Sequence, residues 1–511
     1  MTPARARFAA GLVAVVAFAA YASGLFHGFV YDDHGALVEN RFWDSPDAWR
    51  QTLTLRTMFD PRVLDGQRPT LLLSILLDRA LGAREAWRYR LTNLIVHAAS
   101  AALLFAWLRG VLHRQGDARA DARAFAAALL FAVHPLASEG VQSPAFREDA
   151  LALFGMLAAL ASGGIRQAGI RVALQMASLV FALGAKESAA ALPFLAALVW
   201  WLFPSERPSR GRMAAEFAVA LALAAAWFAT AYAYRPAQAT GTEWNGLSLR
   251  WPQNLLTAPD LFLRYLGLMA VPWPLCVDRV IEPVAAIMSP RFLMAVGVAV
   301  AWASAAVAMR RRVPLAALGM GWIALQFGPV SNLVPLFNPF AERYAYAMIP
   351  GFAMLAASLP LSRSWVRVGL TLLAVTFLAL LQLRLQDWRD DETLWRATLR
   401  VEPRSARAHT WLGLAALERG DLESAALWFA RADLLNPQDV TALINLAILD
   451  GRRGDLDSAS ARLEEAVRRR PGKSEAWANL AVVRELQGRP AAAQQARERA
   501  QALDLLRRYA P

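Results

Sequence analysis

The chain is poor in the residues that form disulfides and soft-metal sites. Its 511 residues include one cysteine, Cys276, and six histidines. A single cysteine excludes an intramolecular disulfide and a zinc site built from several cysteines. No histidine and cysteine spacing in the sequence matches a metal site either. We therefore predict no tightly bound metal or other cofactor.

Lysine is also nearly absent, since only Lys186 and Lys473 are lysines among the 54 basic residues. Arginine therefore supplies most of the formal net charge of +13. The arginines gather in short clusters between apolar runs, as in membrane proteins that follow the positive-inside rule, and not on one basic face. This distribution argues against a nucleic-acid partner. The bias towards arginine and alanine is typical of a GC-rich bacterial genome.

Charged residues make up only 19% of the chain, whereas 57% of its residues are hydrophobic. The mean hydropathy of +0.31 indicates that much of the chain lies in lipid. A membrane-spanning helix needs about 20 mostly apolar residues. About eleven segments approach this length, which predicts an all-α polytopic membrane protein. They lie near residues 8–26, 91–108, 124–137, 149–163, 171–185, 188–203, 214–234, 291–309, 314–330, 343–360 and 367–385.

The loops that carry arginine predict the orientation of these spans. They all fall on one side if the eleven spans alternate and residues 259–276 do not cross. We therefore expect an interfacial or re-entrant helix at 259–276, with a crossing helix as the alternative. The N-terminus is then cytoplasmic. The first span, which follows Arg5 and Arg7, is expected to be a signal anchor, although its "AYA" stretch also fits a cleavage site; in both cases residue 27 onward starts outside.

A repeat begins near residue 388, where the apolar runs stop. Glycine recurs every 34 residues, at Gly420, Gly454 and Gly488, and leucine, alanine and proline follow the same period. This period predicts tetratricopeptide repeats that form an α-solenoid. We therefore expect a membrane domain at residues 1–387 and a repeat domain at residues 388–511, with about three repeats and a half-repeat. The repeats are expected to dock a protein or, alternatively, only to stabilise the membrane domain.

Two adjacent carboxylates, Asp32 and Asp33, stand in the stretch "GFVYDDHGALVEN" directly after the first span. Their mutual repulsion is expected to raise the pKa of one carboxyl group unless a cation or a substrate lies nearby. Taken alone, such a pair is more typical of a solvated loop than of a catalytic site.

Other charged and polar residues fall at span ends on the same outer face. Three of them are cations, Arg68, Lys186 and Arg343, and each alone fits a side chain that extends to the membrane interface. Together with the aspartate pair they predict one cavity that faces outside. Further residues expected around this cavity are His134, Glu139, Arg147, Glu187, Glu342 and Tyr344.

Several stretches, taken in order, resemble the transmembrane and tetratricopeptide repeat-containing O-mannosyltransferases. They are "FVYDDHGALVEN", "RPTLLLSILLDRALG", "YRLTNLIVHAASAALLF", "HPLASEGVQSPAFREDAL", "LGAKESAAALPFL" and "NPFAERYAYAMIPGF", followed by the repeats. The resemblance covers nearly the whole chain. It implies the GT-C glycosyltransferase fold, in which an acidic motif of the first outer loop serves catalysis and a polyprenyl-phosphate-linked sugar is the donor. It also implies inversion at the anomeric carbon of the sugar.

The resemblance gives the predicted residues their roles. A sugar phosphate leaves as an anion and needs no proton, so one carboxylate acting as general base for the acceptor hydroxyl is enough. We assign this role to Asp32 and a positioning role to Asp33, and the sequence leaves open which of the two takes the proton. The three cations are predicted to bind the donor phosphate. The six further residues are expected to bind sugar hydroxyls or to hold the cations, and a bridging divalent cation, Mg²⁺ or Mn²⁺, stays an alternative.

The sequence therefore predicts an inverting glycosyltransferase in a bacterial inner membrane, with its active site and repeats on the periplasmic side. The expected reaction moves mannose or a similar hexose from the lipid-linked donor to Ser or Thr hydroxyls of an envelope protein docked by the repeats. One alternative keeps the fold and changes the acceptor to a lipid or a polysaccharide. Another is a non-catalytic, membrane-anchored repeat scaffold.

Overall fold

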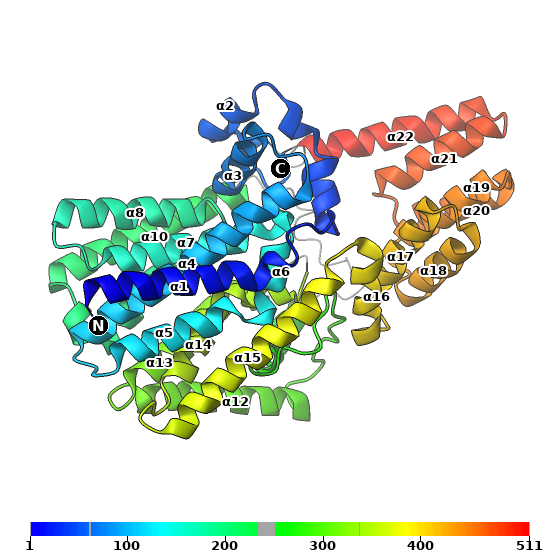
Figure 1. Ribbon diagram of the computed structural model, residues 1–511. Coiled ribbons are helices and arrows are strands. Elements are labelled where there is room, and N and C mark those ends of the chain that lie inside the picture. Colours follow the sequence, from blue (N-terminus) through cyan, green and yellow to red (C-terminus); the bar gives the residue numbers. More distant parts are fainter. Residues whose placement is uncertain (1, 61–62, 234–250, 337, 510–511) are drawn as a thin grey trace.

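The computed structural model describes residues 2–60, 63–233, 251–336 and 338–509 (Figure 1). Every regular element within these ranges is helical, so the predicted all-α class is confirmed for the described part of the chain. An apolar bundle comes first, and a row of short helix pairs then projects from one side of it.

Apolar helices form the bundle, and α4 packs against α1, α5 and α7 at its centre. A Cβ atom at Gly319 of α13 would lie 2.4 Å from the carbonyl oxygen of Gly351 in α14, so these two glycines let the two helices touch. The α-helices that precede the repeats are α1 (Pro3–Ala22), α2 (Ala48–Leu53), α3 (Pro69–Ala80), α4 (Ala86–Arg114), α5 (Ala120–Ala132), α6 (Ser138–Gln142), α7 (Arg147–Ser162), α8 (Ala168–Leu183), α9 (Leu192–Leu202), α10 (Arg210–Ala233), α11 (Gln253–Ala270), α12 (Pro290–Met309), α13 (Pro314–Phe327), α14 (Ile349–Ala357) and α15 (Ser364–Asp387).

Five helices in the described ranges, α1, α4, α10, α12 and α15, are long and apolar enough to cross a membrane. A sixth candidate joins α5 to the segment Pro135–Gln142 across a bend of 52°. Other predicted spans form shorter helices, such as α8 with 16 residues and α13 with 14 residues. At 1.5 Å per residue, 16 residues cover about 24 Å of a hydrocarbon core that is about 30 Å thick. The number of about eleven spans therefore stays a prediction, as does the interfacial placement of residues 259–276, which α11 covers in large part.

The segment between α1 and α4 folds over one end of the bundle. One face of α3 packs into a small core with Trp43 and Tyr89. Arg90 of α4 is fully buried and donates hydrogen bonds to the backbone carbonyls of His27, Gly28 and Gln142. The bonds to His27 and Gly28 fix the stretch of chain between α1 and the aspartate pair.

Helix pairs follow the bundle, and their turns have the predicted glycines. Gly420, Gly454 and Gly488 have φ angles of +78°, +82° and +71°, in the left-handed region where glycine carries no steric cost. The predicted tetratricopeptide-type repeats are confirmed as consecutive helical hairpins. Their helices are α16 (Asp391–Val401), α17 (Ala406–Glu418), α18 (Leu422–Leu435), α19 (Thr441–Arg452), α20 (Leu456–Arg469), α21 (Ser474–Leu486) and α22 (Pro490–Tyr509).

Alanine at Gly454 is expected to destabilise the repeats, because a left-handed backbone costs a residue other than glycine roughly 1–2 kcal/mol. Gly451 is the matched control, since it lies in α19 and a Cβ there meets no atom within 4 Å. G451A should stabilise the same helix by about 0.5–1 kcal/mol. Thermal unfolding of the full-length chain in detergent, followed by circular dichroism, compares the two variants. A melting temperature of G454A at or above that of G451A would contradict the role of this turn.

Candidate functional site

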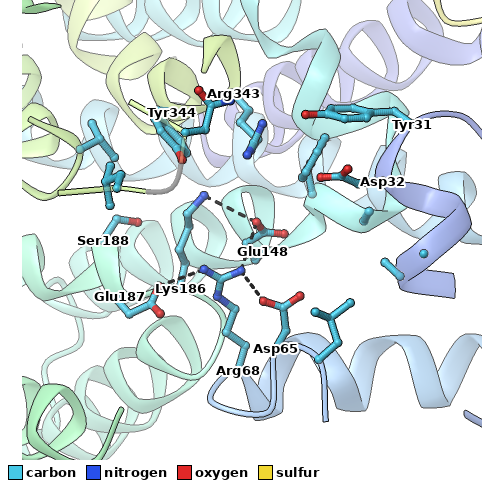
Figure 2. A pocket seen from close by; sticks show the side chains of 18 of the residues that line it. Tyr31, Asp32, Asp65, Arg68, Glu148, Lys186, Glu187, Ser188, Arg343 and Tyr344 are labelled. Carbon is cyan, nitrogen blue, oxygen red and sulfur yellow. Dashed lines mark hydrogen bonds and ion pairs between the residues drawn. The ribbon is translucent and has the colours of Figure 1, made fainter. Parts of the chain in front are cut away.

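A cavity of about 1170 Å³ opens between the bundle and the first repeat helices (Figure 2). Its wall comes mainly from four parts of the chain that are distant in sequence: residues 31–68, 145–188, 328–344 and 391–418. Ligand sites commonly measure about 300–1,000 Å³. The cavity therefore has room for a sugar phosphate together with part of an acceptor.

The cavity brings together about half of the residues predicted for the site. Those on its wall are Asp32, Arg68, Lys186, Glu187, Arg343 and Tyr344, all labelled in Figure 2. Those that the structure places away from the wall are Asp33, His134, Glu139, Arg147 and Glu342.

Asp32 presents its carboxylate to the cavity directly after a strained residue. Tyr31 has a φ of +58°, a region that costs a residue other than glycine of order 1–3 kcal/mol. No hydrogen bond to the Asp32 carboxylate comes from any described residue. Solvent reaches Asp32 through the cavity. Partial removal of its carboxylate from water by the surrounding protein raises the pKa of Asp32 to about 6, while the cations Arg343 and Arg407 oppose the rise. An unpaired carboxylate with such a pKa is suited to accept a proton near neutral pH.

Asp33 points into the protein and is fully buried. Its Oδ1 atom accepts hydrogen bonds from Ser143 Oγ at 2.7 Å and from the backbone N–H of Ala145 at 3.0 Å. Its Oδ2 atom accepts a third bond, from the backbone N–H of Val30 at 3.3 Å. Asp33 thus fastens the loop after α1 to the segment between α6 and α7, a position that fits the predicted positioning role.

Arg343 reaches the cavity from the short helical segment before α14. Its guanidinium donates to Glu139 Oε1 at 2.7 Å, and its backbone N–H donates to Glu139 Oε2 at 2.9 Å. The guanidinium carbon lies 4.0 Å from the centre of the Phe146 ring, in cation–π contact. Glu139 therefore holds Arg343 from behind the cavity wall and leaves its other donors available to a ligand.

Lys186 and Arg68 lie on another part of the wall and have more acidic neighbours. Lys186 Nζ is 2.6 Å from an oxygen of Asp149 and 3.7 Å from one of Glu148. Arg68 has carboxylate oxygens of Asp65, Glu187 and Glu148 at 2.8, 3.3 and 3.5 Å. Figure 2 shows the ion pairs of Arg68 with Asp65 and Glu187 and that of Lys186 with Glu148. The charge of both cations is thus largely balanced by the protein itself.

Acidic residues outnumber basic residues on the described part of the cavity wall. Seven are acidic, Asp32, Glu39, Asp65, Glu148, Glu187, Asp391 and Glu418, and three are basic, Arg68, Lys186 and Arg343. Seven negative and three positive charges give a formal charge of −4 with histidine neutral. Because ionised carboxylates accept hydrogen bonds from hydroxyl groups, this wall suits a polyhydroxylated ligand. An anionic group is favoured beside Arg343, which has the fewest acidic partners.

Two residues predicted to touch the sugar are instead satisfied inside the protein. His134 Nε2 bonds to the carbonyl oxygen of Met269 at 3.0 Å, and its ring packs against two phenylalanines. Glu342 pairs with Arg279 at 2.7 Å and accepts a hydrogen bond from the backbone N–H of Cys276 at 2.9 Å. Neither side chain reaches the cavity. Both residues lie at ends of predicted spans, and there the backbone directs their side chains into the protein.

Arg147 is also buried away from the cavity. Its guanidinium lies 2.6 Å from Asp78 and donates to Asn93 Oδ1 at 2.6 Å and to the carbonyl oxygen of Tyr89 at 2.8 Å. These partners lie on α3 and α4, so Arg147 joins three helices. Loss of one partner of such a buried pair is expected to destabilise the fold.

Several wall residues were not predicted from the sequence. They include His34 beside the aspartate pair and three residues of α16 and α17, Asp391, Trp411 and Glu418. Nothing in the repeat period indicates that its first helices fold back on the membrane part. The only signal in the sequence was the pair Asp390 and Asp391, and such a pair is equally typical of the start of a helix.

No group of three or more His, Cys, Asp or Glu residues in the described ranges is arranged to hold a metal ion. The expectation of no tightly bound cofactor, and the alternative of a divalent cation at Asp32 or Asp33, both stay predictions.

Comparison with known families supports the repeats. The family model described as tetratricopeptide repeat matches residues 378–440 and 444–508. Among solved structures, one of MamA shares 19% identity, covers 29% of this chain and 74% of its own, and has a TM-score of 0.20. That score is too low to relate the two folds.

Part of the chain is similar to protein O-mannosyl-transferases. Tmtc3 of Drosophila melanogaster is 31% identical over 137 residues, which are 25% of this chain and 15% of that protein. TMTC3 of Mus musculus is 30% identical over 166 residues, which are 30% of this chain and 16% of that protein. The match thus spans less than a fifth of the length of these relatives.

Replacing each aspartate of the pair by asparagine should have opposite effects on stability. D33N should lower the melting temperature: burial raises the pKa of Asp33 as well, but an asparagine there has only one accepting oxygen, so its NH2 group would face either the Val30 N–H or the donors Ser143 and Ala145. D32N should leave the melting temperature unchanged or raise it at pH 7. Because the pKa of Asp32 is raised to about 6 in the folded protein, its ionised form lowers the stability of the fold, and this loss is complete above about pH 6. Thermal unfolding of both full-length variants in detergent makes the comparison. A D32N protein less stable than D33N would contradict the placement of the two side chains.

Proposed function

We propose that this chain is an inverting, membrane-embedded glycosyltransferase of the GT-C type. It moves mannose or a similar hexose from a polyprenyl-phosphate donor to Ser or Thr hydroxyls of a protein. The observation that carries the proposal is the placement of the Asp32 carboxylate, which faces a large cavity without a hydrogen-bond partner among the described residues. The raised pKa of Asp32, which partial removal from water brings to about 6, agrees with it. The similarity of part of the chain to protein O-mannosyl-transferases supports the reaction class.

Asp32 acts as general base in this mechanism. The acceptor hydroxyl transfers its proton to a carboxylate oxygen of Asp32 while its own oxygen attacks the anomeric carbon of the sugar. The bond between that carbon and the phosphate oxygen breaks, and the lipid phosphate takes the electron pair and leaves as an anion. Because attack is opposite to the leaving group, one displacement inverts the anomeric centre. A base whose pKa lies slightly below the working pH is ionised and still able to hold the proton.

Arg343 is the best placed of the three predicted phosphate ligands. It keeps one acidic partner, Glu139, and its planar guanidinium can meet two phosphate oxygens at once. Arg68 and Lys186 are balanced by nearby carboxylates, so we assign them mainly to ordering those carboxylates. Those of the ordered carboxylates that lie on the cavity wall, Asp65, Glu148 and Glu187, then bind sugar hydroxyls together with Tyr344.

The proposed location is a bacterial inner membrane with the cavity on the periplasmic side. Five long apolar helices, the shorter ones between them and the arginine-bearing loops support a membrane domain at residues 1–387 with about eleven spans and a cytoplasmic N-terminus. The repeat domain, residues 388–511, then lies in the periplasm and docks the protein acceptor. The donor supplies the lipid partner, and no bound metal is required for the roles given above.

D32N should abolish glycosyl transfer, with a loss of about 10²–10⁴-fold, because the acceptor hydroxyl loses its proton acceptor. The assay follows labelled hexose from a short-chain polyprenyl-phosphate mannose to a Ser/Thr-containing acceptor peptide in membrane vesicles. D44N is the matched control, since Asp44 lies in the same outer loop with its side chain 72% exposed and pairs with Arg79. A D32N protein with the activity of D44N would exclude Asp32 as the base.

The rate of transfer should depend on pH in one direction. Asp32 accepts a proton only when ionised, so the rate should be constant near pH 7.5 and fall about tenfold per unit below about pH 6. Initial rates measured between pH 5 and 8, with recovery after return to pH 7.5 as the control for irreversible damage, give the profile. A rate that stays constant down to pH 5 would contradict a carboxylate base with this pKa.

A further inference from the structure

Asp391, in the first turn of α16, touches the loop that carries Asp32 at two points. Its Oδ1 atom accepts a hydrogen bond from the backbone N–H of Tyr31 at 2.7 Å. Its Oδ2 atom bonds to Nε2 of His34, also at 2.7 Å. One carboxylate of α16, the helix of the half-repeat, therefore binds the residues directly before and after the aspartate pair.

Further contacts hold Tyr31 against the same two helices. Arg407 of α17 donates a hydrogen bond to the Tyr31 hydroxyl. The Tyr31 ring meets Trp395 of α16 edge to face, with centroids 5.1 Å apart. Trp395 in turn stacks on Trp411 of α17 at 5.7 Å, with the ring planes 7° apart. The backbone, ring and hydroxyl of Tyr31 are thus all fixed by the start of the repeat array.

The backbone of Tyr31 needs such support. Its φ of +58° is unfavourable for a tyrosine by of order 1–3 kcal/mol, and a residue in this region persists only where its surroundings determine it. The same turn decides which way the next side chain points. With Tyr31 held in this conformation, Asp33 enters the protein and Asp32 faces the cavity. A relaxed backbone at Tyr31 would redirect the Asp32 carboxylate without removing it.

We propose that Asp391 is a positioning residue for glycosyl transfer, which holds the Tyr31–His34 segment so that Asp32 faces the bound sugar. The first repeat helices, α16 and α17, are then part of the catalytic apparatus and not only a docking surface for the acceptor. This inference rests on the proposed function and assigns to the repeats a task that acceptor docking does not include.

The two tasks differ in the kinetic constant that they affect. A docking residue contributes to acceptor binding, so its loss raises the KM of the acceptor. A positioning residue acts on the geometry of the bound complex, so its loss lowers kcat while KM changes little. Misplacement of a catalytic group by about 1 Å can cost about 100-fold in rate.

The test compares D391A, D391N and E392Q in the full-length chain, with polyprenyl-phosphate mannose and a Ser/Thr-containing peptide in vesicles. D391A should lower kcat about 100-fold and change the KM of donor and peptide less than about twofold. The kcat of D391N should lie between those of D391A and the wild type, because the asparagine oxygen still accepts the hydrogen bond from the Tyr31 N–H. E392Q, the matched control, should behave as the wild type, since Glu392 pairs with Arg396 and Arg419 instead of the loop.

The outcomes separate this inference from the function on which it rests. A wild-type chain that transfers no sugar contradicts the proposed function. An active wild type with a D391A kcat within about threefold of normal, or with a raised peptide KM at unchanged kcat, overturns the positioning role alone. An equal loss of kcat in E392Q also overturns the positioning role, because the effect is then not specific to the contact with the Tyr31–His34 segment. If D391A does not accumulate in membranes, the isosteric D391N decides between these outcomes.

Discussion

A carboxylate whose charge the surrounding protein disfavours and no hydrogen bond stabilises is unfavourable, and the site depends on holding one in place. Asp32 has no such partner among the described residues, and its pKa rises to about 6. The protein keeps it in place through its neighbours, since Asp33 is tied to the segment between α6 and α7 and Tyr31 is tied to α16 and α17. The contacts of Asp33 and Tyr31 thus offset the unfavourable free energy of the Asp32 carboxylate.

This arrangement makes one site from parts of the chain that look separate in sequence. The apolar bundle supplies Arg343 and the carboxylate-rich wall near Lys186, and the loop after α1 supplies Asp32. The half-repeat helix α16 and the next helix, α17, complete the cavity wall with Asp391 and Trp411. A repeat domain attached in this way cannot be treated as an independent adaptor. Its first two helices line the cavity, and only the later hairpins are assigned to the proposed contact with an acceptor.

Local sequence patterns predicted the helices and turns of the fold better than the contacts between them. The 34-residue period placed the turn glycines correctly because Gly420, Gly454 and Gly488 act within their own hairpins. Hydropathy predicted the apolar segments but not their lengths, because it does not register the bend between α5 and the segment that starts at Pro135.

The same limit applies to the site. Asp32, Arg68, Lys186 and Arg343 line one cavity, whereas the outer face on which the sequence grouped them, and their roles, stay proposals. His134 and Glu342 turn inwards, and Asp391 joins the site, through contacts between residues more than 60 positions apart. Such contacts depend on how helices pack, and no spacing in the sequence encodes them. The anomeric configuration of the transferred sugar, determined by NMR and compared with that of the donor, tests the single-base mechanism most directly: inversion is predicted, and retention would contradict it.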